Sequence, residues 1–505
     1  MSTNGVPLQL SIATGTYRCD WRIEDPDDPA KTYDTSGEAN LEPSRQFSGG
    51  VFGRAPLLKT PTADGGLQSK LPQTFNYPIV HGRLDRGEDI VLLDAVLTVW
   101  DEDRGSGLMH FSGPNAIFDS AVALVGRDIP AVDRIVFDSF RIQITGLDEF
   151  AATPPIAETA YPRQVSEPGK HVWSATYRPE SNQAWSDDDA QVTVDYSGSA
   201  TVADPYRFAV SFSPTIEIRL KEPLEFSEFY QSWIVPLVGI VCAATGEQEK
   251  ITYLACSPVF EEDDRPPQRR RMQAFMGRVT QEPFASVTDY KRRRYCAIKL
   301  GEGHSLLELL RLWQREAAFG NPILETYDVT ALSADQHPRA RFLLLVQAIE
   351  GLCGYENRFR DQTAEYQDKN KAMLEKIRPL LEAKDWQKIK RNLRSTPVNL
   401  DNVLTEMSVT LPFDLMGALG QTSLVKAVRS SSTHPVSTEA AIRTVRNDLA
   451  HGRKNHDLYD LDDAAGLLNR VARAHLLRIL NVAEEQQLEV LDPDRFLRGP
   501  KTVEG

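Results

Sequence analysis

The sequence predicts an α+β multidomain protein in which a β-rich N-terminal domain is followed by an all-α helical bundle. Its 505 residues are enough for two or three domains of ordinary size. Up to about residue 300, apolar residues alternate with the period of two of a β-strand, and from about Ser305 they recur with the helical period of 3.6. We therefore expect a β-rich domain over residues 1–300 and a helical domain over residues 301–505.

Several segments of the first domain have strand-like alternation. The clearest is "DIVLLDAVLTVW", and "RIVFDSFRIQITG" and "PTIEIRL" repeat the pattern. A helix expected at about residues 227–243 interrupts the strands, which resume in "KITYLAC". Its most apolar part, from Trp233 to Ala244, contains Pro236 and is shorter than a membrane span, so it predicts a buried helix. The whole pattern indicates a sandwich or barrel with a packed helix.

The second domain begins with the amphipathic segment "SLLELLRLWQREAAFG", which places Leu306, Leu309, Leu310 and Trp313 on one face. Further helices are expected at residues 341–353, as one charged helix through "AEYQDKNKAMLEKIRPLLEAKDWQKIKRNL", around Arg446, and from about 462 to 485. Successive amphipathic helices without intervening strands predict an all-α bundle.

The composition restricts the class of protein. With 41% hydrophobic and 25% charged residues it is typical of a soluble globular protein, and neither a signal peptide nor an apolar run of transmembrane length is visible. The five widely spaced cysteines favour a reducing compartment over a disulfide framework or a zinc knuckle. We therefore expect a cytoplasmic protein with no membrane partner. The net charge of −14 means that any binding of nucleic acid would have to be local.

The residues with the clearest chemical potential are Arg446 and His451. An arginine and a histidine beside one phosphate can cleave RNA without a metal, because the imidazole moves the proton of the 2′-hydroxyl while the guanidinium stabilises the charge on phosphorus. The spacing alone proves little, because Arg429 with His434 and Arg470 with His475 repeat it. The surrounding sequence has to distinguish the three pairs.

That surrounding sequence favours Arg446 and His451. Ser437 to Glu439 predict a helix start, and Gly452 stands where a left-handed cap residue belongs. Asn447 and His451 then lie one turn apart, on a face away from the apolar stripe, and Arg443 and Arg446 lie between that face and the stripe. By contrast, residues 429–434 indicate a loop, and residues 470 and 475 are expected to be solvated or close to a cap. The plainer alternative is that His451 only caps its helix.

A family resemblance supports the first interpretation. The stretch "AAIRTVRNDLAHG" resembles the Arg-polar-His signature of HEPN domains, helical bundles found in prokaryotic toxins, phage-defence nucleases and type VI CRISPR effectors. Upstream, "RARFLLLVQAIEGLCG" is similar to the first helix of the ApeA-like HEPN subset, in which a Gln-x-x-Glu pair follows the apolar run. Here that pair is Gln347 and Glu350.

The N-terminal half carries a second resemblance. "ITGLDEFAATPPI", "TIEIRL", "KEPLEFSEFYQSWIVPLVGIVCAATG" and "ITYLAC" look like the large β-rich domain that precedes HEPN in ApeA-type anti-phage proteins. The two resemblances together cover most of the chain. They imply that a sensing or regulatory domain, answering to a phage-derived trigger, precedes a nuclease.

The resemblance implies a metal-independent endoribonuclease without a cofactor. His451 would be the general acid and base, Arg446 would stabilise the phosphate, and Asn447 would hold both in register, giving a 2′,3′-cyclic phosphate and a 5′-hydroxyl. Glu350 either orients a cation at this helix or is an ordinary surface carboxylate. Because HEPN motifs usually face each other across one groove, a homodimer or larger even oligomer is implied, with Arg443, Arg453 and Lys454 of each copy near the RNA.

A basic segment between the two domains is a second candidate for contact with RNA. It combines two clusters of cations with interleaved aromatic residues, a composition that can follow a phosphate backbone and stack bases. The alternative is a solvated linker over residues 261–300, whose neighbouring "EEDD" partly cancels the positive charge. The cations are Arg269, Arg270, Arg271, Lys291, Arg292, Arg293 and Arg294.

Other motifs are weak, and two other classes of function remain open. The sequence has no Walker-type phosphate loop, no His-Glu-x-x-His helix and no Gly-x-Ser-x-Gly elbow, and it predicts no metal site. The glycines at 49–53 indicate a turn, and His81 and His110 indicate partly buried, hydrogen-bonded histidines. The rival functions are a catalytically silent HEPN interaction module whose β domain binds a partner or ligand, and a carbohydrate- or ligand-binding β domain with a helical appendage.

Overall fold

The computed structural model divides the chain into two compact units, which are described separately below. The first comprises residues 1–241, 249–290 and 299–307, and the second comprises residues 242–248, 291–298 and 308–505. The chain therefore passes between the units several times between residues 241 and 308, rather than once at the boundary expected near residue 300. The structure describes residues 12–28, 30–58, 60–61, 67–68, 70–100, 115–160, 174–201, 209–260, 271–285, 296–327, 336–393 and 398–491.

The first unit is built on a long antiparallel sheet. Thirteen of the described strands follow one another in the order β13-β14-β15-β10-β16-β17-β9-β7-β6-β1-β2-β3-β8. Two short pairs, β4 with β5 and β11 with β12, stand outside it. The strands are β1 (Gly15–Glu24), β2 (Thr32–Leu41), β3 (Phe47–Val51), β4 (Thr60–Pro61), β5 (Leu67–Gln68), β6 (Gln73–Leu84), β7 (Asp89–Val99), β8 (Ala116–Ser120), β9 (Val122–Gly126), β10 (Val136–Ile144), β11 (Ile156–Ala160), β12 (Ser174–Tyr177), β13 (Gln183–Ser186), β14 (Ala190–Thr201), β15 (Ala209–Leu224), β16 (Ile251–Val259) and β17 (Met272–Met276).

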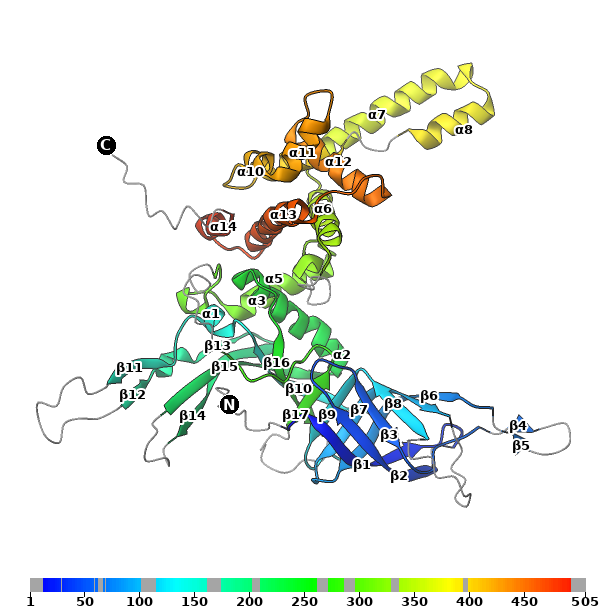
Figure 1. Cartoon of the computed structure of the whole chain (residues 1–505), viewed down its shortest axis with the longest axis vertical. Helices are drawn as coiled ribbons and strands as arrows, with labels where there is room; N and C mark the ends of the chain where they lie inside the picture. The colour runs from blue at the N-terminus through cyan, green and yellow to red at the C-terminus, as the bar shows by residue number, and fades with distance from the viewer. Residues whose placement is uncertain are drawn as a thin grey trace, which may run out of the picture. The chain divides into compact units, whose positions relative to one another are not determined.

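Six of these described strands close into a barrel, because β8 pairs with both β3 and β7. The first half of β7, Asp89–Leu93, pairs with β9, whereas its second half, Val96–Val99, pairs with β8. Asp94 lies between the halves with a left-handed φ of 50°, a conformation that bends the strand at this point. The barrel and its continuation into the open sheet confirm the β-rich prediction (Figure 1).

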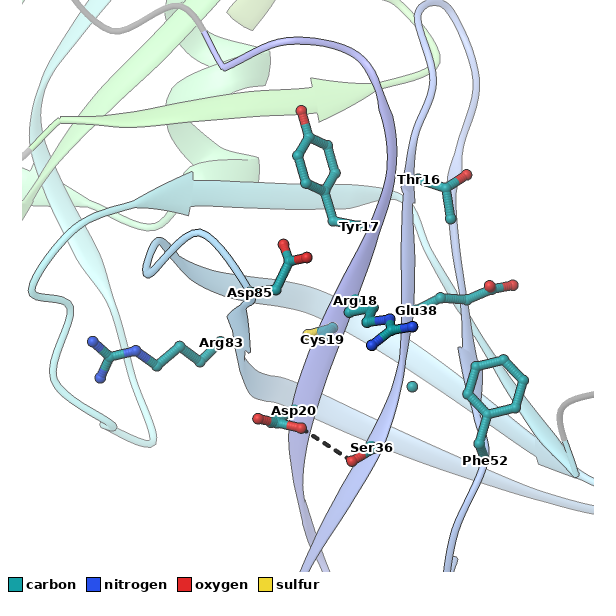
Figure 2. A pocket seen from close by; sticks show the side chains of 11 residues that line it. Thr16, Tyr17, Arg18, Cys19, Asp20, Ser36, Glu38, Phe52, Arg83 and Asp85 are labelled. Carbon is teal, nitrogen blue, oxygen red and sulfur yellow. Dashed lines mark hydrogen bonds between the residues drawn. The ribbon is translucent and has the colours of Figure 1, made fainter.

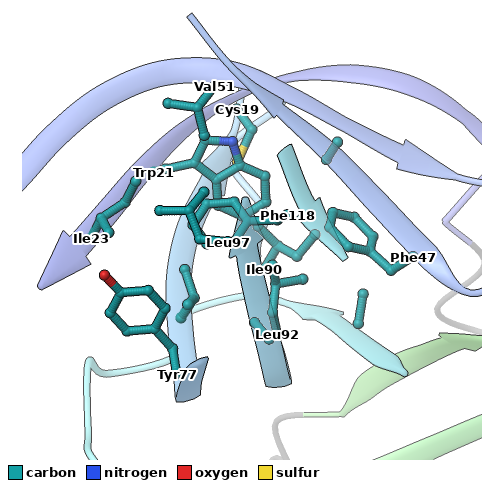
Figure 3. Packing of buried hydrophobic residues seen from close by; sticks show 14 of the residues in the cluster. Cys19, Trp21, Ile23, Phe47, Val51, Tyr77, Ile90, Leu92, Leu97 and Phe118 are labelled. Carbon is teal, nitrogen blue, oxygen red and sulfur yellow. The ribbon is translucent and has the colours of Figure 1, made fainter. Parts of the chain in front are cut away.

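The barrel is filled by alternating inward-facing residues. In β1, every second residue from Tyr17 to Ile23 is buried, as the period-two pattern requires. The ring of Trp21 packs edge-on against Phe47 and at a tilt against Phe118, and its indole N–H donates to the carbonyl of Gly50 at 3.1 Å (Figure 3).

Glycine allows the strands of the barrel to approach this indole. A Cβ added to Gly37 would lie 2.0 Å from the carbonyl oxygen of Gly50 and 2.6 Å from the indole nitrogen of Trp21. Gly49 and Gly50 belong to β3, so the turn predicted over residues 49–53 is wrong for its first three residues. These glycines make room for the ring of Trp21 and do not form a turn. The glycine-rich sequence alone does not reveal this contact.

The predicted helix of the first domain is confirmed as a continuous helical segment. It consists of α2 (Phe226–Phe229), a π-helical turn η2 (Tyr230–Ile234) and α3 (Val235–Thr245). The ring of Phe229 stacks on that of Phe140 in β10, with centroids 3.6 Å apart. Among the described residues, Phe226–Thr245 is long and apolar enough to cross a membrane, but 72% of it is buried inside the protein, as in a core helix.

Three shorter features complete the described part of the first unit. They are α1 (Leu147–Ala151) and the 3₁₀ turns η1 (Pro179–Ser181) and η3 (Leu300–Glu302). The linker predicted over residues 261–300 is wrong in part, because β17 forms a fully buried strand between β16 and β9. Its five residues, "MQAFM", are too few to reveal a strand beside so many cations.

The second unit is helical over the described residues 338–491, as predicted, but the single helix expected through residues 364–393 is wrong, because a 3₁₀ turn that contains Pro379 divides it in two. Its core forms where α13 packs against α6 and α14, and where α12 packs against α6, α9, α10 and α11. Buried apolar residues on α6, such as Phe342 and Ile349, meet those of its neighbours. The helices and 3₁₀ turns are α5 (Leu306–Ala318), η4 (Leu324–Tyr327), α6 (Pro338–Tyr355), α7 (Arg360–Ile377), η5 (Arg378–Leu380), α8 (Ala383–Asn392), α9 (Leu400–Val409), α10 (Leu415–Gln421), α11 (Ser423–Ser431), α12 (Thr438–His451), α13 (Leu458–Ile479) and α14 (Glu484–Leu491).

Candidate active site

Both ends of α12 are fixed by local hydrogen bonds. The Ser437 side chain accepts from the backbone N–H of Ala440 at 3.2 Å, and Gly452 adopts the left-handed conformation at φ 64°. The backbone N–H of Arg453 donates to the carbonyl of Asp448 at 2.9 Å, which completes a Schellman-type end. The side chain of Arg339 in α6 also donates to the carbonyl of Leu449. The helix therefore has the start and stop that its sequence predicts.

The structure brings Arg446 of α12 and Glu350 of α6 together. A guanidinium nitrogen of Arg446 lies 3.3 Å from a carboxylate oxygen of Glu350, and the other terminal nitrogen lies 3.2 Å from the side-chain oxygen of Asn447. The side chains of Arg446 and Glu350 are each about one-third exposed. Arg446 is therefore held in a defined position with part of its guanidinium open to solvent.

His451 lies in the last turn of α12 and is exposed. Among the described residues no hydrogen bond or ion pair joins its imidazole, so the ring is open to a substrate. Arg453 and Lys454, which follow the glycine cap, are exposed as well. Asn447 is predicted to hold both Arg446 and His451 in place. It accepts a hydrogen bond from Arg446, but no described hydrogen bond joins it to His451.

His456 is a residue near this site that the sequence did not single out. Its Nε2 lies 3.2 Å from a carboxylate oxygen of Asp448, and its side chain is only 5% exposed. The contact ties the segment after Gly452 back onto α12, next to His451 in sequence. The sequence gives no sign of this contact, because Asp448 and His456 meet only when the chain reverses its direction after Gly452.

Arg443 has a different environment from the one predicted. Its Nε donates to Asp401 of α9 at 2.8 Å, and no described hydrogen bond or ion pair joins it to Arg446 or His451. The prediction that Arg443 faces the candidate site together with Arg446 and His451 therefore receives no support from the described contacts. The carboxylate comes from a different helix and could not be read from the sequence of α12.

The two other Arg-His pairs lie in contrasting places. Arg429 belongs to the last turn of α11 rather than to a loop, and it donates to the backbone of Val436 and to the hydroxyl of Thr438, which anchors the start of α12. Arg470 is exposed, but His475 is completely buried, so the prediction of a solvated or cap-proximal histidine is wrong.

The burial of His475 has an electrostatic consequence. Desolvation lowers the pKa of its imidazole to about 3, and the nearby cations Arg478 and Arg358 add to the effect. Neither ring nitrogen has a hydrogen-bond partner among the residues that the structure describes. His475 is therefore a neutral core residue without access to a substrate, and of the three pairs only Arg446 and His451 combine accessibility with a positioned guanidinium.

A cavity of about 570 Å³ adjoins the Arg446–Glu350 ion pair, because Glu350 also lines that cavity. Its walls come from the end of α6, the start of α7 and the start of α9. Arg358 on its wall is already paired with Glu356 at 2.6 Å, whereas Arg360 is exposed and has no partner among the described residues. Phe359 lies between these two arginines in sequence and also lines the wall. Cation, aromatic ring and amide groups are suited to hold a nucleotide.

The basic segment predicted to bind RNA receives little structural support. Arg269, Arg270 and the cluster from Lys291 to Arg294 lie outside the described residues. Arg271 is described, and it forms an ion pair of 2.9 Å with Glu217 while its side chain is 21% exposed. Its guanidinium is therefore compensated by a carboxylate of β15, so the described contacts give no support for Arg271 as an open RNA contact, which stays a prediction.

The predicted histidine and cysteine environments can be compared directly. His81 is partly buried, with Nε2 2.9 Å from the carbonyl of Val132, as predicted, while His110 lies outside the described residues. All five cysteines are buried free thiols. Among the described residues no group of three or more His, Cys, Asp or Glu side chains is arranged to hold a metal ion.

The outer surface of the barrel carries a second cavity, of about 660 Å³ (Figure 2). Outward-facing residues of β1, β2 and β6 line it, including Arg18, Glu38 and Arg83. Asp20 and Ser36 form a hydrogen bond of 3.1 Å in its wall, and Phe52, 47% exposed, stands at one side. A polar groove with charges of both signs and an exposed aromatic ring is suited to a polar partner rather than to an apolar ligand.

The fold of the first unit agrees with a comparison of the chain with known families. Residues 21–248 match the family described as ApeA N-terminal domain 1. This region is similar to the ApeA N-terminal domain. The match begins within β1 and extends beyond α3, so it covers most of the barrel and of the open sheet. It ends before α5 and the helices that follow it, so the HEPN resemblance of those helices stays a prediction. Neither a curated protein nor a solved structure matches the chain.

Proposed function

We propose that this ApeA-like chain is a metal-independent endoribonuclease of anti-phage defence, with its active site at the end of α12. The observation that carries the proposal is the pairing of a held guanidinium with an open imidazole on one helix. Arg446 is bound by Glu350 and Asn447, while His451 is exposed and unpaired among the described residues. If His451 only capped its helix, that role would not explain the ion pair between Arg446 and Glu350.

The chemistry follows from these two groups. The neutral imidazole of His451 removes the proton of a ribose 2′-hydroxyl, and the 2′-oxygen attacks the adjacent phosphorus. The bond from phosphorus to the 5′-oxygen breaks, that oxygen takes up a proton from an imidazolium, and the products are a 2′,3′-cyclic phosphate and a 5′-hydroxyl. Arg446 stabilises the negative charge that develops on the phosphoryl oxygens.

A homodimer would supply the second proton-transfer group. One imidazole acts as base while the other, from the facing copy, acts as acid, and the cations Arg453 and Lys454 of both copies add positive charge to an otherwise acidic protein. Mixing inactive His451→Ala chains with wild type should then reduce the activity below the value expected from simple dilution of the wild-type chains. An active monomer in light scattering at assay concentration would contradict this part of the proposal.

The barrel groove supports a regulatory role for the first unit. Its volume of about 660 Å³ and its charged walls are suited to a polar segment of a phage-derived trigger. The same groove is the observation that favours the alternative function, a catalytically silent protein whose β domain binds a partner and whose helices only associate.

Cleavage of RNA in excess chelator separates these two functions. We expect the purified full-length chain to cleave unfractionated tRNA in EDTA and to leave 2′,3′-cyclic phosphate ends, because neither proposed catalytic group needs a metal. His434→Ala, at the exposed look-alike histidine, is the matched control and should cleave as the wild type does. Absence of cleavage would favour the silent module, and cleavage that requires added magnesium would contradict the mechanism.

A further inference from the structure

The helical hairpin formed by α7, η5 and α8 stands apart from the core of its unit. No residue of α7 or α8 is buried, although α7 has 18 residues and α8 has ten. Figure 1 shows α7 running away from the other helices of the unit and α8 returning from the turn. Because it buries none of its residues, the hairpin adds little to the hydrophobic stability of the bundle.

The charge of α8 differs from that of the whole protein. Its ten residues contain four cations and one carboxylate, Asp385, whereas the complete chain has a net charge of −14. By contrast, α7 carries four cations and four carboxylates. The positive charge of the hairpin is therefore concentrated on its second helix.

The cations of α8 are also arranged on one side. At about 100° per residue, Lys384, Lys388 and Arg391 lie within about 60° of one another. The opposite side carries the half-buried Trp386 and Ile389, and the guanidinium of Arg378 lies 5.9 Å from the ring centre of Trp386. The apolar side thus faces the hairpin, and the cationic stripe faces solvent.

The three residues of the stripe are exposed and have no ion pair in the part of the chain that the structure describes. They extend over about 10 Å of helix, a length comparable to a few phosphates of a nucleic-acid strand. An isolated row of solvated lysines is common on helices, but an uncompensated row on a projecting hairpin of an acidic protein provides a local positive surface.

The base of the hairpin lies beside the candidate active site. Phe359 and Arg360, at the start of α7, line the same cavity as Glu350, and Glu350 binds Arg446. From this cavity, α7 extends for about 27 Å. A continuous route therefore joins the proposed cleavage site, the cavity and the outer part of the hairpin.

We propose that the stripe of Lys384, Lys388 and Arg391 binds the phosphate backbone of a structured RNA whose cleaved nucleotide lies at Arg446 and His451. The inference rests on the proposed ribonuclease function and specifies its substrate class. An RNA long enough to reach both places is bound by the hairpin, whereas a short single strand reaches only the cavity and α12. The enzyme therefore prefers folded RNA over short oligonucleotides.

The test compares the triple variant K384Q/K388Q/R391Q with K369Q/K371Q/K376Q, which removes the same charge from exposed positions of α7. In full-length protein carrying His451→Ala, the stripe variant should bind unfractionated tRNA about tenfold or more weakly, and the slope of log affinity against log salt should fall by about 2 to 3. The α7 variant should bind with nearly wild-type affinity. In the active background, the stripe variant should cleave tRNA more slowly but a single strand of about six nucleotides at the wild-type rate.

Each other outcome has a distinct meaning. If wild type cleaves RNA and the stripe variant binds and cleaves tRNA equally well, the hairpin inference is overturned and the proposed function stands. If wild type neither binds nor cleaves any RNA, the proposed function fails. If the stripe is needed for binding to vesicles of anionic lipid but not to tRNA, the hairpin serves a membrane surface instead. Equal loss of short-strand cleavage would show that the substitutions disturb the site itself, which also contradicts the inference.

Discussion

Two helices of the second unit carry an arginine and a histidine at the same spacing, yet they place them in opposite environments. On α12, Arg446 is held by Glu350 and His451 is open to solvent. On α13, Arg470 is exposed while His475 is fully buried without a hydrogen-bond partner. The difference shows that spacing identifies a candidate, whereas the elements packed around it determine whether the candidate can meet a substrate.

The largest expected difference between the two helices is in catalysis. His451→Ala and Arg446→Ala should each reduce RNA cleavage by about two orders of magnitude or more, because one removes the proton-transfer group and the other the stabilising charge. Thermal unfolding should change little, since both side chains are at least partly exposed. His475→Leu, which keeps the core filled, should retain most of the activity. A chain that is inactive as His475→Leu and active as His451→Ala would reverse the assignment.

A smaller effect is expected from the carboxylate that positions Arg446. Glu350→Gln should lower kcat by roughly threefold to tenfold while KM changes less, because the guanidinium loses a defined orientation. The stability change should stay below about 1 kcal/mol, as for other partly exposed ion pairs. Asp401→Asn is the matched control, since it removes the carboxylate that binds Arg443 on the same helix. Equal kinetic effects of the two substitutions would remove the distinction between Glu350 and an ordinary surface carboxylate.

The third difference concerns stability against pH. In the folded protein the pKa of His475 is lowered to about 3, below its ordinary value of about 6.5, so between these values the unfolded chain binds one more proton. Stability from the neutral, buried imidazole is present above pH 6.5 and is lost as the pH falls toward 3, with a limiting slope of about 1.4 kcal/mol per pH unit.

Unfolding midpoints measured from pH 7.5 down to pH 5 test this slope. His475→Leu should lose part of the decline seen in wild type, because it removes the imidazole that must stay neutral in the folded core. If His475→Leu declined in parallel with wild type, the burial of His475 would have no measurable consequence for stability.

Local sequence was enough to predict the change from strands to helices and the limits of α12. The alternation of β1 and β7, the Ser437 cap and the left-handed Gly452 depend only on residues within or beside each element. The same is true of the helix within residues 226–245, whose apolar run is longer than a strand requires. In these places the physical cause is short-range, so the sequence pattern and the structure agree.

Tertiary structure alone decided where charges and cavities lie. The closure of β8 onto β3, the ion pair of Arg271 with Glu217 and that of Arg446 with Glu350 join residues far apart in the chain. On α13, the continuous buried run from Val471 to Leu477 shows that helices surround it on several sides, so a pattern that looks amphipathic hides a buried histidine. A sequence determines the face that each element can bury, but the partners that cover that face come from elsewhere in the chain, and they set the burial and charge on which function depends.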